Sequence, residues 1–244
     1  MMKNKIWKLV WQDEFDGLDI DQTKWHLDTG YTGGSNGELE IYTPRPKNVC
    51  IKDGCLVITA RQEEYQGFLY TAARLKTQGL HSWKYGRIEA FIKIPSGQGV
   101  WPAFWMLGND ISTVGWPDCG EIDIMEHIGY RADTVRGTIH GPGYSRDDSV
   151  GADFTKPGVN FSDDFHLFAV EWEPDQISWY VDDCQYSTLT THSVPGKWAF
   201  DHPFFLLLNL AVGGHWPGYP DETTIFPKFM VVDYVRVYEK VESD

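Results

Sequence analysis

Long apolar runs are absent from this chain of 244 residues. No stretch approaches the roughly 18 apolar residues that a membrane-spanning helix needs, so we expect no membrane partner. The segment Met1–Trp7 starts with basic residues but lacks the apolar core and the small-residue cleavage site of a signal peptide. The segment therefore predicts either a cytoplasmic protein or a mature or trimmed form of a secreted one.

Cysteine is also scarce, and the four present are Cys50, Cys55, Cys119 and Cys184. This is too few for a disulfide scaffold, and the spacing lacks the paired ligands of a zinc site. Cys50 and Cys55 flank a turn and could bridge across it. Buried free thiols are the default expectation.

Positive charge is in deficit, because 21 Lys and Arg residues face 35 Asp and Glu residues, for a formal net charge of −14. A charge of this sign repels nucleic acids, anionic membranes and sulfated or uronic polymers. Aromatic residues, in contrast, make up 15% of the chain and include 11 Trp and 12 Tyr. That is more ring surface than a core of this size usually holds, so we expect a neutral ligand and aromatic rings on its binding surface.

A helical hydrophobic period is missing from nearly the whole chain, and only Gly196–His202 is a candidate for one short helix. Alternation with a period of two dominates instead. The predicted strands are Val49–Lys52, Cys55–Arg61, Leu69–Leu75, Gly86–Ile94, Trp101–Leu107, Thr134–His140, Phe165–Glu173, Gln176–Val181, Phe204–Val212 and Met230–Glu239. Short strands separated by Gly- and Pro-rich turns predict an all-β fold, a two-sheet β-sandwich of the jelly-roll type. Nothing resembles a linker, so we expect one domain over residues 1–244.

Three carboxylates lie in one short apolar run, Cys119–His127. Burying unpaired carboxylates is costly, so a chain that keeps three of them together is expected to use them. The alternative is an edge strand with a solvated acidic face. The apolar and aromatic flanking sequence argues against that alternative.

Strand parity places Glu121 and Asp123 on one face, whereas Glu126 has the opposite parity. One inserted residue, a β-bulge at Ile124–Met125, would bring Glu126 back to the face of the other two. The two glutamates would then act as if four residues apart, roughly 13 Å along the backbone. Side chains that lean together can approach the separation of about 5–5.5 Å that suits a retaining glycosidase.

The run Gly120–Glu126 resembles the signature of glycoside hydrolase family 16, in the form typical of laminarinases, the endo-1,3-β-glucanases. Other segments resemble laminarinases in the same order along the chain: Trp11–Phe15, Ala73–Thr77, Trp83–Glu89, Trp101–Leu107, Asn209–Gly214 and Val232–Val237. The resemblance covers nearly the whole chain. One departure is His215, where laminarinases commonly have Asn before Trp-Pro-Gly, and it bears on the rim of the cleft.

The resemblance implies that Glu121 is the nucleophile, Glu126 the general acid/base and Asp123 the auxiliary acid between them. Three like charges on one face cannot all ionise freely, so a proton should be shared among them. No cofactor is required for this chemistry. The activity implied is hydrolysis of laminarin-type β-1,3-glucan with retention, and mixed-linkage glucan is a secondary substrate.

An open cleft on the concave face should be lined with aromatic rings, because sugars offer apolar faces that stack on them. By resemblance, Trp101 and Trp105 form the floor beside the scissile bond, and Trp116 extends the wall. Polar contacts to sugar hydroxyls are implied for Asn36, Arg74 and His140. Core packing or structural hydrogen bonding is the competing role for each of these side chains.

A structural calcium site is also implied by the resemblance. Asp233 alternates in phase with Val231, Val235 and Val237, so its carboxylate should point toward an apolar layer and needs a partner. The resemblance adds backbone carbonyls of Glu14 and Gly54 as further ligands, and calcium accepts such oxygens. A salt bridge to Lys or Arg is the alternative for Asp233.

Other functions are weaker. Gly33–Gly37 matches the G-x-S-x-G pattern of serine hydrolases, but the required strand-turn-helix context is missing. Cys119 as a nucleophile would have its thiol pKa raised by the nearby carboxylates. A lectin-like sandwich that binds carbohydrate without turnover is the main rival. We expect a monomer, and a polymeric substrate implies an extracellular location unless the protein is cytoplasmic.

Overall fold

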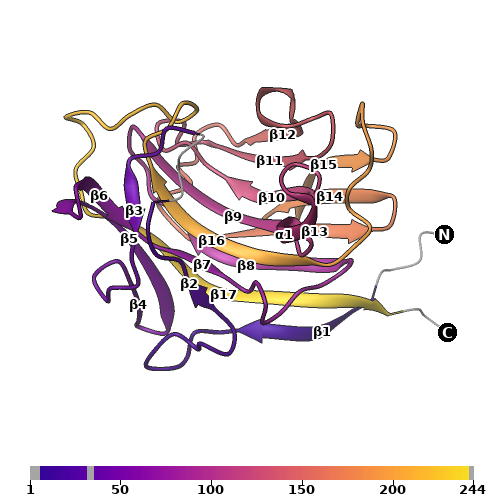
Figure 1. The fold of residues 1–244 in the computed structure, drawn as a ribbon, viewed down its shortest axis with the longest axis horizontal. Helices are drawn as coiled ribbons and strands as arrows, with labels where there is room; N and C mark the ends of the chain where they lie inside the picture. The colour runs from indigo at the N-terminus through magenta and orange to yellow at the C-terminus, as the bar shows by residue number, and fades with distance from the viewer. Residues whose placement is uncertain (1–5, 32–35, 242–244) are drawn as a thin grey trace.

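The structure, a computed structural model, describes residues 6–31 and 36–241, and within them almost all regular structure is β. One sheet has seven strands in the order β12 (Val150–Thr155), β11 (Thr134–His140), β10 (Glu121–Glu126), β9 (Val100–Gly108), β16 (Phe204–Val212), β7 (Arg74–Lys76) and β2 (His26–Leu27). Figure 1 shows how this sheet curves across the molecule.

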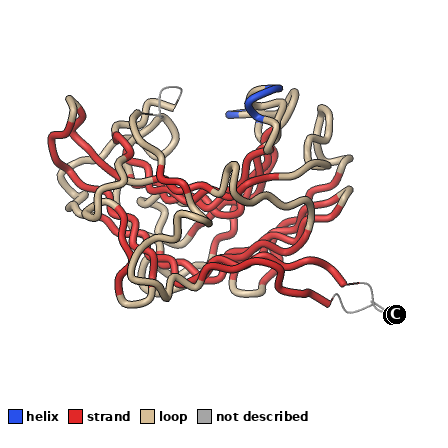
Figure 2. Tube along the Cα trace, turned by 60° about the horizontal axis from the view of Figure 1, so that its bottom comes forward, coloured by secondary structure: helices blue, strands red, loops and turns tan. Residues whose placement is uncertain are grey.

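The other sheet has ten strands, of which eight follow the order β15 (Cys184–Thr190), β14 (Gln176–Val181), β13 (His166–Glu173), β8 (Gly86–Lys93), β17 (Lys228–Val241), β5 (Cys55–Tyr65), β6 (Phe68–Ala72) and β3 (Glu40–Tyr42). Two more strands join it, β1 (Ile6–Asp13) beside β17 and β4 (Val49–Lys52) beside β5. Figure 2 shows the strands in two layers, with the short helix α1 (Ile111–Val114) among loops beyond the end of one layer. The predicted all-β, two-sheet sandwich is therefore confirmed.

The apolar core fills the space between the sheets. The alternation read from Gly86–Ile94 is confirmed, since Ile88, Ala90, Ile92 and Ile94 are all buried. Side chains from β9, β10 and β16 of the facing sheet meet them, including Phe104, Ile122 and Leu206. Strands such as β17 thus hide one face and leave the other accessible, whereas β16 is buried along its whole length.

Three local predictions are wrong. Residues 196–202 form bends and loop, and the helical segments of the described residues are α1 and the 3₁₀ turn η1 (Arg146–Asp148). The expected strand Leu69–Leu75 is interrupted at Ala73 and contributes β6 to one sheet and β7 to the other. All four cysteines are free as expected, but Cys184 is exposed and Cys50 and Cys55 are half-buried. Across residues 6–31 and 36–241, no helix has the length and apolar character to cross a bilayer.

Candidate active site

A β-bulge in β10 turns Glu126 to the solvent-facing side of the seven-stranded sheet. Asp123 pairs with Trp105 of β9 and Glu126 pairs with Ala103, so β10 advances three residues while β9 advances two. The two residues inside the irregularity, Ile124–Met125, are both buried in the core. The bulge predicted from parity is confirmed, and Glu121, Asp123 and Glu126 share one face, called the carboxylate face below.

The bulge is held from beneath by the opposite sheet. The Trp179 indole of β14 donates a hydrogen bond of 2.8 Å to the backbone carbonyl of Asp123. Gly137 of β11 makes room for this ring, because a Cβ at that position would lie 2.3 Å from Trp179 Cδ1. A bulge leaves ladder groups unpaired, and here a buried indole satisfies one of them.

Neutral N–H donors contact the two glutamates. Trp116 Nε1 donates to Glu121 Oε2 at 2.7 Å, and Trp101 Nε1 donates to Glu126 Oε1 at 3.1 Å. Each indole thus fixes the position of one carboxylate without adding a positive charge.

His140 contacts the carboxylates of Asp123 and Glu121. Its Nε2 lies 3.2 Å from Asp123 Oδ2 and 3.8 Å from Glu121 Oε1. Its Nδ1 accepts the backbone N–H of Arg146 at 3.1 Å, which leaves the ring proton on Nε2 in the neutral imidazole. The backbone of the loop that contains η1 therefore orients a third donor toward the carboxylate face.

Burial dominates the electrostatics of the three acids. Burial, reinforced by the charge of Asp123, raises the pKa of Glu121 to about 8, while His140 and Trp116 act in the opposite direction. Burial also raises the pKa of Asp123 to about 7. The pKa of Glu126 rises well above its usual value for the same reason, and the charges of Asp123 and Glu121 raise it further. The cluster therefore retains protons near neutral pH, which an acid catalyst needs.

Two tryptophans of β9 follow the carboxylate face as predicted. Trp101 reaches Glu126, and Trp105 Nε1 donates to Asn209 Oδ1 of β16 at 2.7 Å. Asn209 Nδ2 in turn donates to Tyr42 Oη at 3.3 Å, so the orientation of the Trp105 ring is fixed by a chain of hydrogen bonds. Both indoles are partly exposed, which leaves them accessible to a ligand.

The predicted polar contacts lie on both sides of the carboxylates. Arg74 of β7 pairs with Asp28 at 2.6 Å and lies opposite Asn209 in the register between β7 and β16. Asn36 is exposed, and its backbone carbonyl accepts the His215 N–H at 2.8 Å. His215, where laminarinases commonly have Asn, is therefore hydrogen-bonded to Asn36, a residue predicted to contact sugar hydroxyls.

Strand pairing brings Asp233 near the backbones of Glu14 and Gly54, the residues expected to hold calcium. The alternation predicted for Asp233 is wrong. Asp233 is the bulged residue between Val232 and Tyr234 of β17, so it does not alternate in phase with Val235, and its side chain is half-buried. Its Oδ1 lies 3.7 Å from Cys55 Sγ, next to Gly54.

The alternative role of Asp233, a salt bridge to Lys or Arg, is not observed among the described residues. In the part of the chain that the structure describes, no Lys or Arg forms an ion pair with it, and the Glu14 carboxylate is taken by Arg236 at 2.8 Å. Asp13 pairs with Val235, which brings the Glu14 backbone alongside the bulge. A carboxylate that lacks a cation partner and has carbonyl oxygens nearby suits calcium. Within the same ranges, the one cluster of three acidic, His or Cys side chains close enough to share a metal is Glu121, Asp123 and His140.

The alternative nucleophiles gain no support. Gly33–Ser35 of the G-x-S-x-G match lie outside the described residues. Burial, together with the charges of Glu121 and Asp110, raises the pKa of the Cys119 thiol to about 11, which disfavours its thiolate.

Sequence reasoning missed several residues around the site. Asn209 and Trp179 position Trp105 and the bulge, and Trp216 packs edge-on against Trp101 with ring centroids 5.4 Å apart. Trp216 and Asn209 both lie in or next to a segment that resembles laminarinases, which could have singled them out. Trp179 and Gly137 act across the two sheets, and no local pattern marks them.

Comparison with known proteins agrees with this geometry. The profile of "Glycosyl hydrolases family 16" matches residues 37–236. A beta-glucanase from Rhodothermus marinus is 47% identical over 97% of this chain and 86% of its own length. The X-ray structure of an endo-beta-1,3-glucanase from Pyrococcus furiosus superposes with a TM-score of 0.93, at 48% identity over 98% of this chain and 97% of that one.

The laminarinase catalytic domain from Thermotoga maritima gives a TM-score of 0.92 at 50% identity, covering 97% of this chain and 99% of that one. Family profile, sequence and structure thus agree over nearly the same residues. The chain belongs to glycosyl hydrolase family 16.

Proposed function

We propose that this protein is a retaining endo-β-1,3-glucanase that hydrolyses laminarin-type glucans by double displacement. The observation that carries the proposal is the β10 bulge, which brings Glu126 to the face of Glu121 and Asp123. The relatives named endo-β-1,3-glucanase and laminarinase support the same substrate class. We take residues 1–244 as one catalytic domain.

In the first step, Glu121 attacks the anomeric carbon while Glu126 gives its proton to the departing glycosidic oxygen. The carbon–oxygen bond to the leaving chain breaks, and a covalent glycosyl ester forms on Glu121. Glu121 and Asp123 share a proton, and its transfer to Asp123 frees the Glu121 carboxylate to attack. The indole N–H of Trp116 steadies the Glu121 carboxylate that attacks.

In the second step, Glu126 removes a proton from water, and the water oxygen attacks the same anomeric carbon. Glu121 leaves as a carboxylate, and Glu126 is protonated again for the next cycle. Two inversions at one carbon give net retention. No cofactor takes part.

The substrate is proposed to lie along the row of Trp105, Trp101 and Trp116, whose rings stack on sugar faces. Asn36, Arg74 and His140 supply polar partners for hydroxyl groups, and His140 also faces the carboxylates. A neutral glucan avoids the repulsion that a net charge of −14, with three acids gathered on the carboxylate face, imposes on a polyanion at this site. Mixed 1,3-1,4-linked glucan is a secondary substrate.

A structural calcium ion is proposed at the Asp233 carboxylate with the backbone carbonyls of Glu14 and Gly54. It would tie β1 and the β4–β5 turn to β17, away from the chemistry. Addition of calcium should raise the melting temperature, and EDTA should reverse the rise. An unchanged melting temperature in both would contradict an occupied, stabilising site.

We also propose that the protein is a monomer acting outside the cell, because its polymeric substrate does not cross membranes. Size-exclusion chromatography with light scattering checks the first point. Detection of the protein in the culture medium of its source organism checks the second.

The test of the proposed function is ¹H NMR of laminarin hydrolysis, with lichenan and agarose as comparison substrates. Retention predicts that new reducing ends appear first as the β-anomer and then mutarotate, with laminarin cleaved fastest. Release of the α-anomer first would contradict the mechanism. Tight binding to laminarin without release of reducing ends would favour the rival lectin-like function.

A further inference from the structure

A groove on the ten-stranded sheet gathers positive charge in an otherwise acidic protein. The groove has a volume of about 770 Å³. Its lining includes five cations, Lys47, Lys52, Arg61, Lys93 and Lys228, and one acid, Asp53. The whole chain has 21 Lys and Arg against 35 Asp and Glu, so this local excess opposes the overall balance.

The floor of the groove is apolar and follows the strand register. Cys50 of β4, Val57 of β5, Val231 of β17 and Lys93 of β8 form one row across four strands, about 14 Å at the usual strand spacing. Phe229 lies in a neighbouring row, and its side chain is 48% exposed. An exposed ring on an apolar floor is a surface on which a sugar can stack.

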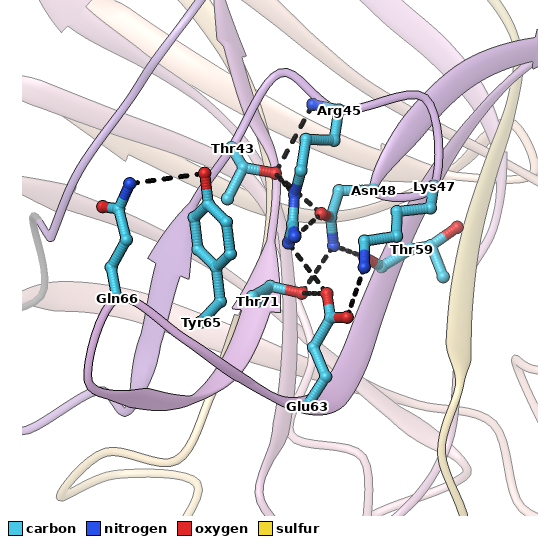
Figure 3. Close-up of polar contacts among 9 residues, drawn as sticks. All are labelled: Thr43, Arg45, Lys47, Asn48, Thr59, Glu63, Tyr65, Gln66 and Thr71. Carbon is cyan, nitrogen blue, oxygen red and sulfur yellow. Dashed lines mark hydrogen bonds and ion pairs between the residues drawn. The ribbon is translucent and has the colours of Figure 1, made fainter.

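Three of the cations are uncommitted. Lys47 pairs with Glu63 at 2.5 Å, in the polar network shown in Figure 3, and Lys93 donates to the Asp163 carbonyl at 2.8 Å. Lys52, Arg61 and Lys228 have no ion-pair partner in the part of the chain that the structure describes. Three cations without ion-pair partners, against one lining acid, raise the local potential and attract an anionic ligand.

The network in Figure 3 makes one rim of the groove rigid. Asn48 is fully buried, and its amide donates to Thr59 O at 3.1 Å and to Thr71 Oγ1 at 2.8 Å. Arg45 donates to Asn48 and to Glu63, both at 2.8 Å. The rim that carries Lys47 is therefore preorganised rather than a loose loop.

We propose that this groove binds a carboxylate-bearing polysaccharide, such as a uronic-acid polymer, at a site separate from the carboxylate face. Arg61 presents the planar fork that suits carboxylates, and the Ser96 and Ser162 hydroxyls on the wall can bond to sugar hydroxyls. A peptide partner fits less well, because the groove lies on the face of a sheet whose backbone groups are already paired. Such a site would retain the enzyme on an acidic matrix while the other sheet cleaves neutral glucan.

The test is affinity electrophoresis through gels that contain polygalacturonate, at low and at high salt. The triple variant Lys52→Gln, Arg61→Gln, Lys228→Gln should bind at least about tenfold more weakly than wild type, and Phe229→Ala about fivefold more weakly. A matched control, Lys8→Gln, Lys84→Gln, Lys197→Gln, removes the same charge from exposed positions outside the groove and should bind like wild type. All variants should cleave laminarin at the wild-type rate.

Three results would overturn the proposal. The first is no retardation of wild type at low salt, and the second is a loss of binding in the control triple variant equal to that in the groove triple variant. The third result is retardation by dextran sulfate equal to that by polygalacturonate and insensitive to Phe229→Ala, which would indicate simple ion exchange. Circular dichroism of each variant confirms that the fold is intact.

Discussion

Two groups of buried acids, one in each sheet of the sandwich, have opposite kinds of partner. In the ten-stranded sheet, Glu89 and Glu171 both contact Arg87, at 2.8 and 3.4 Å, and Tyr238 donates a further hydrogen bond to Glu89. In the seven-stranded sheet, the carboxylate face is contacted by indole and imidazole N–H groups. Arg136, whose charge lowers the pKa of Asp123, pairs with Asp153 at 2.9 Å.

The difference separates structural acids from reactive ones. A guanidinium holds a buried carboxylate in its ionised form and so stabilises the fold. Neutral donors fix the position of a carboxylate while burial keeps its proton affinity high, as the raised pKa values of Glu121 and Asp123 illustrate. Proton transfer requires the second arrangement.

Glu40 tests the limits of this distinction. It is fully buried, and burial with the charge of Glu38 raises its pKa to about 8. Its Oε2 accepts the Val212 N–H at 2.8 Å, and among the described residues no cation pairs with it. It lies on β3 of the ten-stranded sheet, away from β10, so a buried acid without a cation is not by itself catalytic.

The largest expected effect comes from neutralising the carboxylate face. Glu121→Gln and Glu126→Gln should each lower kcat on laminarin by roughly 10³-fold or more, because nucleophile and acid/base are lost in turn. The melting temperature should not fall, because both changes remove a buried charge. Glu171→Gln is the matched control in the other sheet and should keep wild-type kcat. Loss of activity in this control would remove the distinction between the sheets.

The next effect is on stability. Arg87→Met leaves Glu89 and Glu171 buried without their guanidinium and should lower the free energy of unfolding by about 3–5 kcal/mol. Urea denaturation measures this change, and laminarin hydrolysis at 25 °C should show an unchanged kcat for the folded protein. A stability loss below about 1 kcal/mol would show that these acids do not depend on the cation.

Glu40 should make stability depend on pH. Its pKa rises from an ordinary value of 4.5 to about 8 on folding, so its favourable contribution is complete below pH 4.5 and is lost as pH rises through 8. Glu40→Gln should therefore raise the unfolding free energy at pH 8.5 relative to wild type, by about 2–4 kcal/mol. The two proteins should agree at pH 4.5. Glu64→Gln, at an exposed position, serves as the control, and equal pH profiles for Glu40→Gln and wild type would contradict the burial argument.

The smallest effect should be a shift in the pH profile. The Trp116 indole lowers the pKa of Glu121, so Trp116→Phe should raise that pKa and move the acid limb of kcat/KM about half a pH unit upward. Trp105→Phe removes an indole N–H that contacts Asn209 instead, so it should leave the limb in place while changing KM. A shift in both variants would assign the effect to altered stacking.

Much of the fold followed from alternation of apolar residues, because period two and burial on one face are the same physical fact. The bulge at Ile124–Met125 also followed, because without it the strand parity of Glu126 would place its carboxylate in the apolar core. The break at Ala73 did not follow. Nothing in the local pattern of Leu69–Leu75 tells that one half pairs with β5 and the other with β16.

The residues of the candidate site that lie in one patterned segment could be predicted from the sequence. The contacts between the two sheets that support them could not. The three acids and Trp101, Trp105 and Trp116 lie in segments with a clear pattern. The support from Trp179 and Gly137 depends on which strands of the two sheets face each other. Likewise, the phase assigned to Asp233 failed because a second bulge, in β17, left no compositional signature.

The central claim is that Glu121 attacks the sugar while Glu126 supplies and removes the proton. Trapping with an activated 2-deoxy-2-fluoro laminaribioside, followed by peptide mass spectrometry, tests it most directly. The account predicts one glycosyl adduct, located on Glu121 and absent from the Glu121→Gln variant. An adduct on Asp123 or Glu126, or turnover by inversion with no adduct, would contradict it.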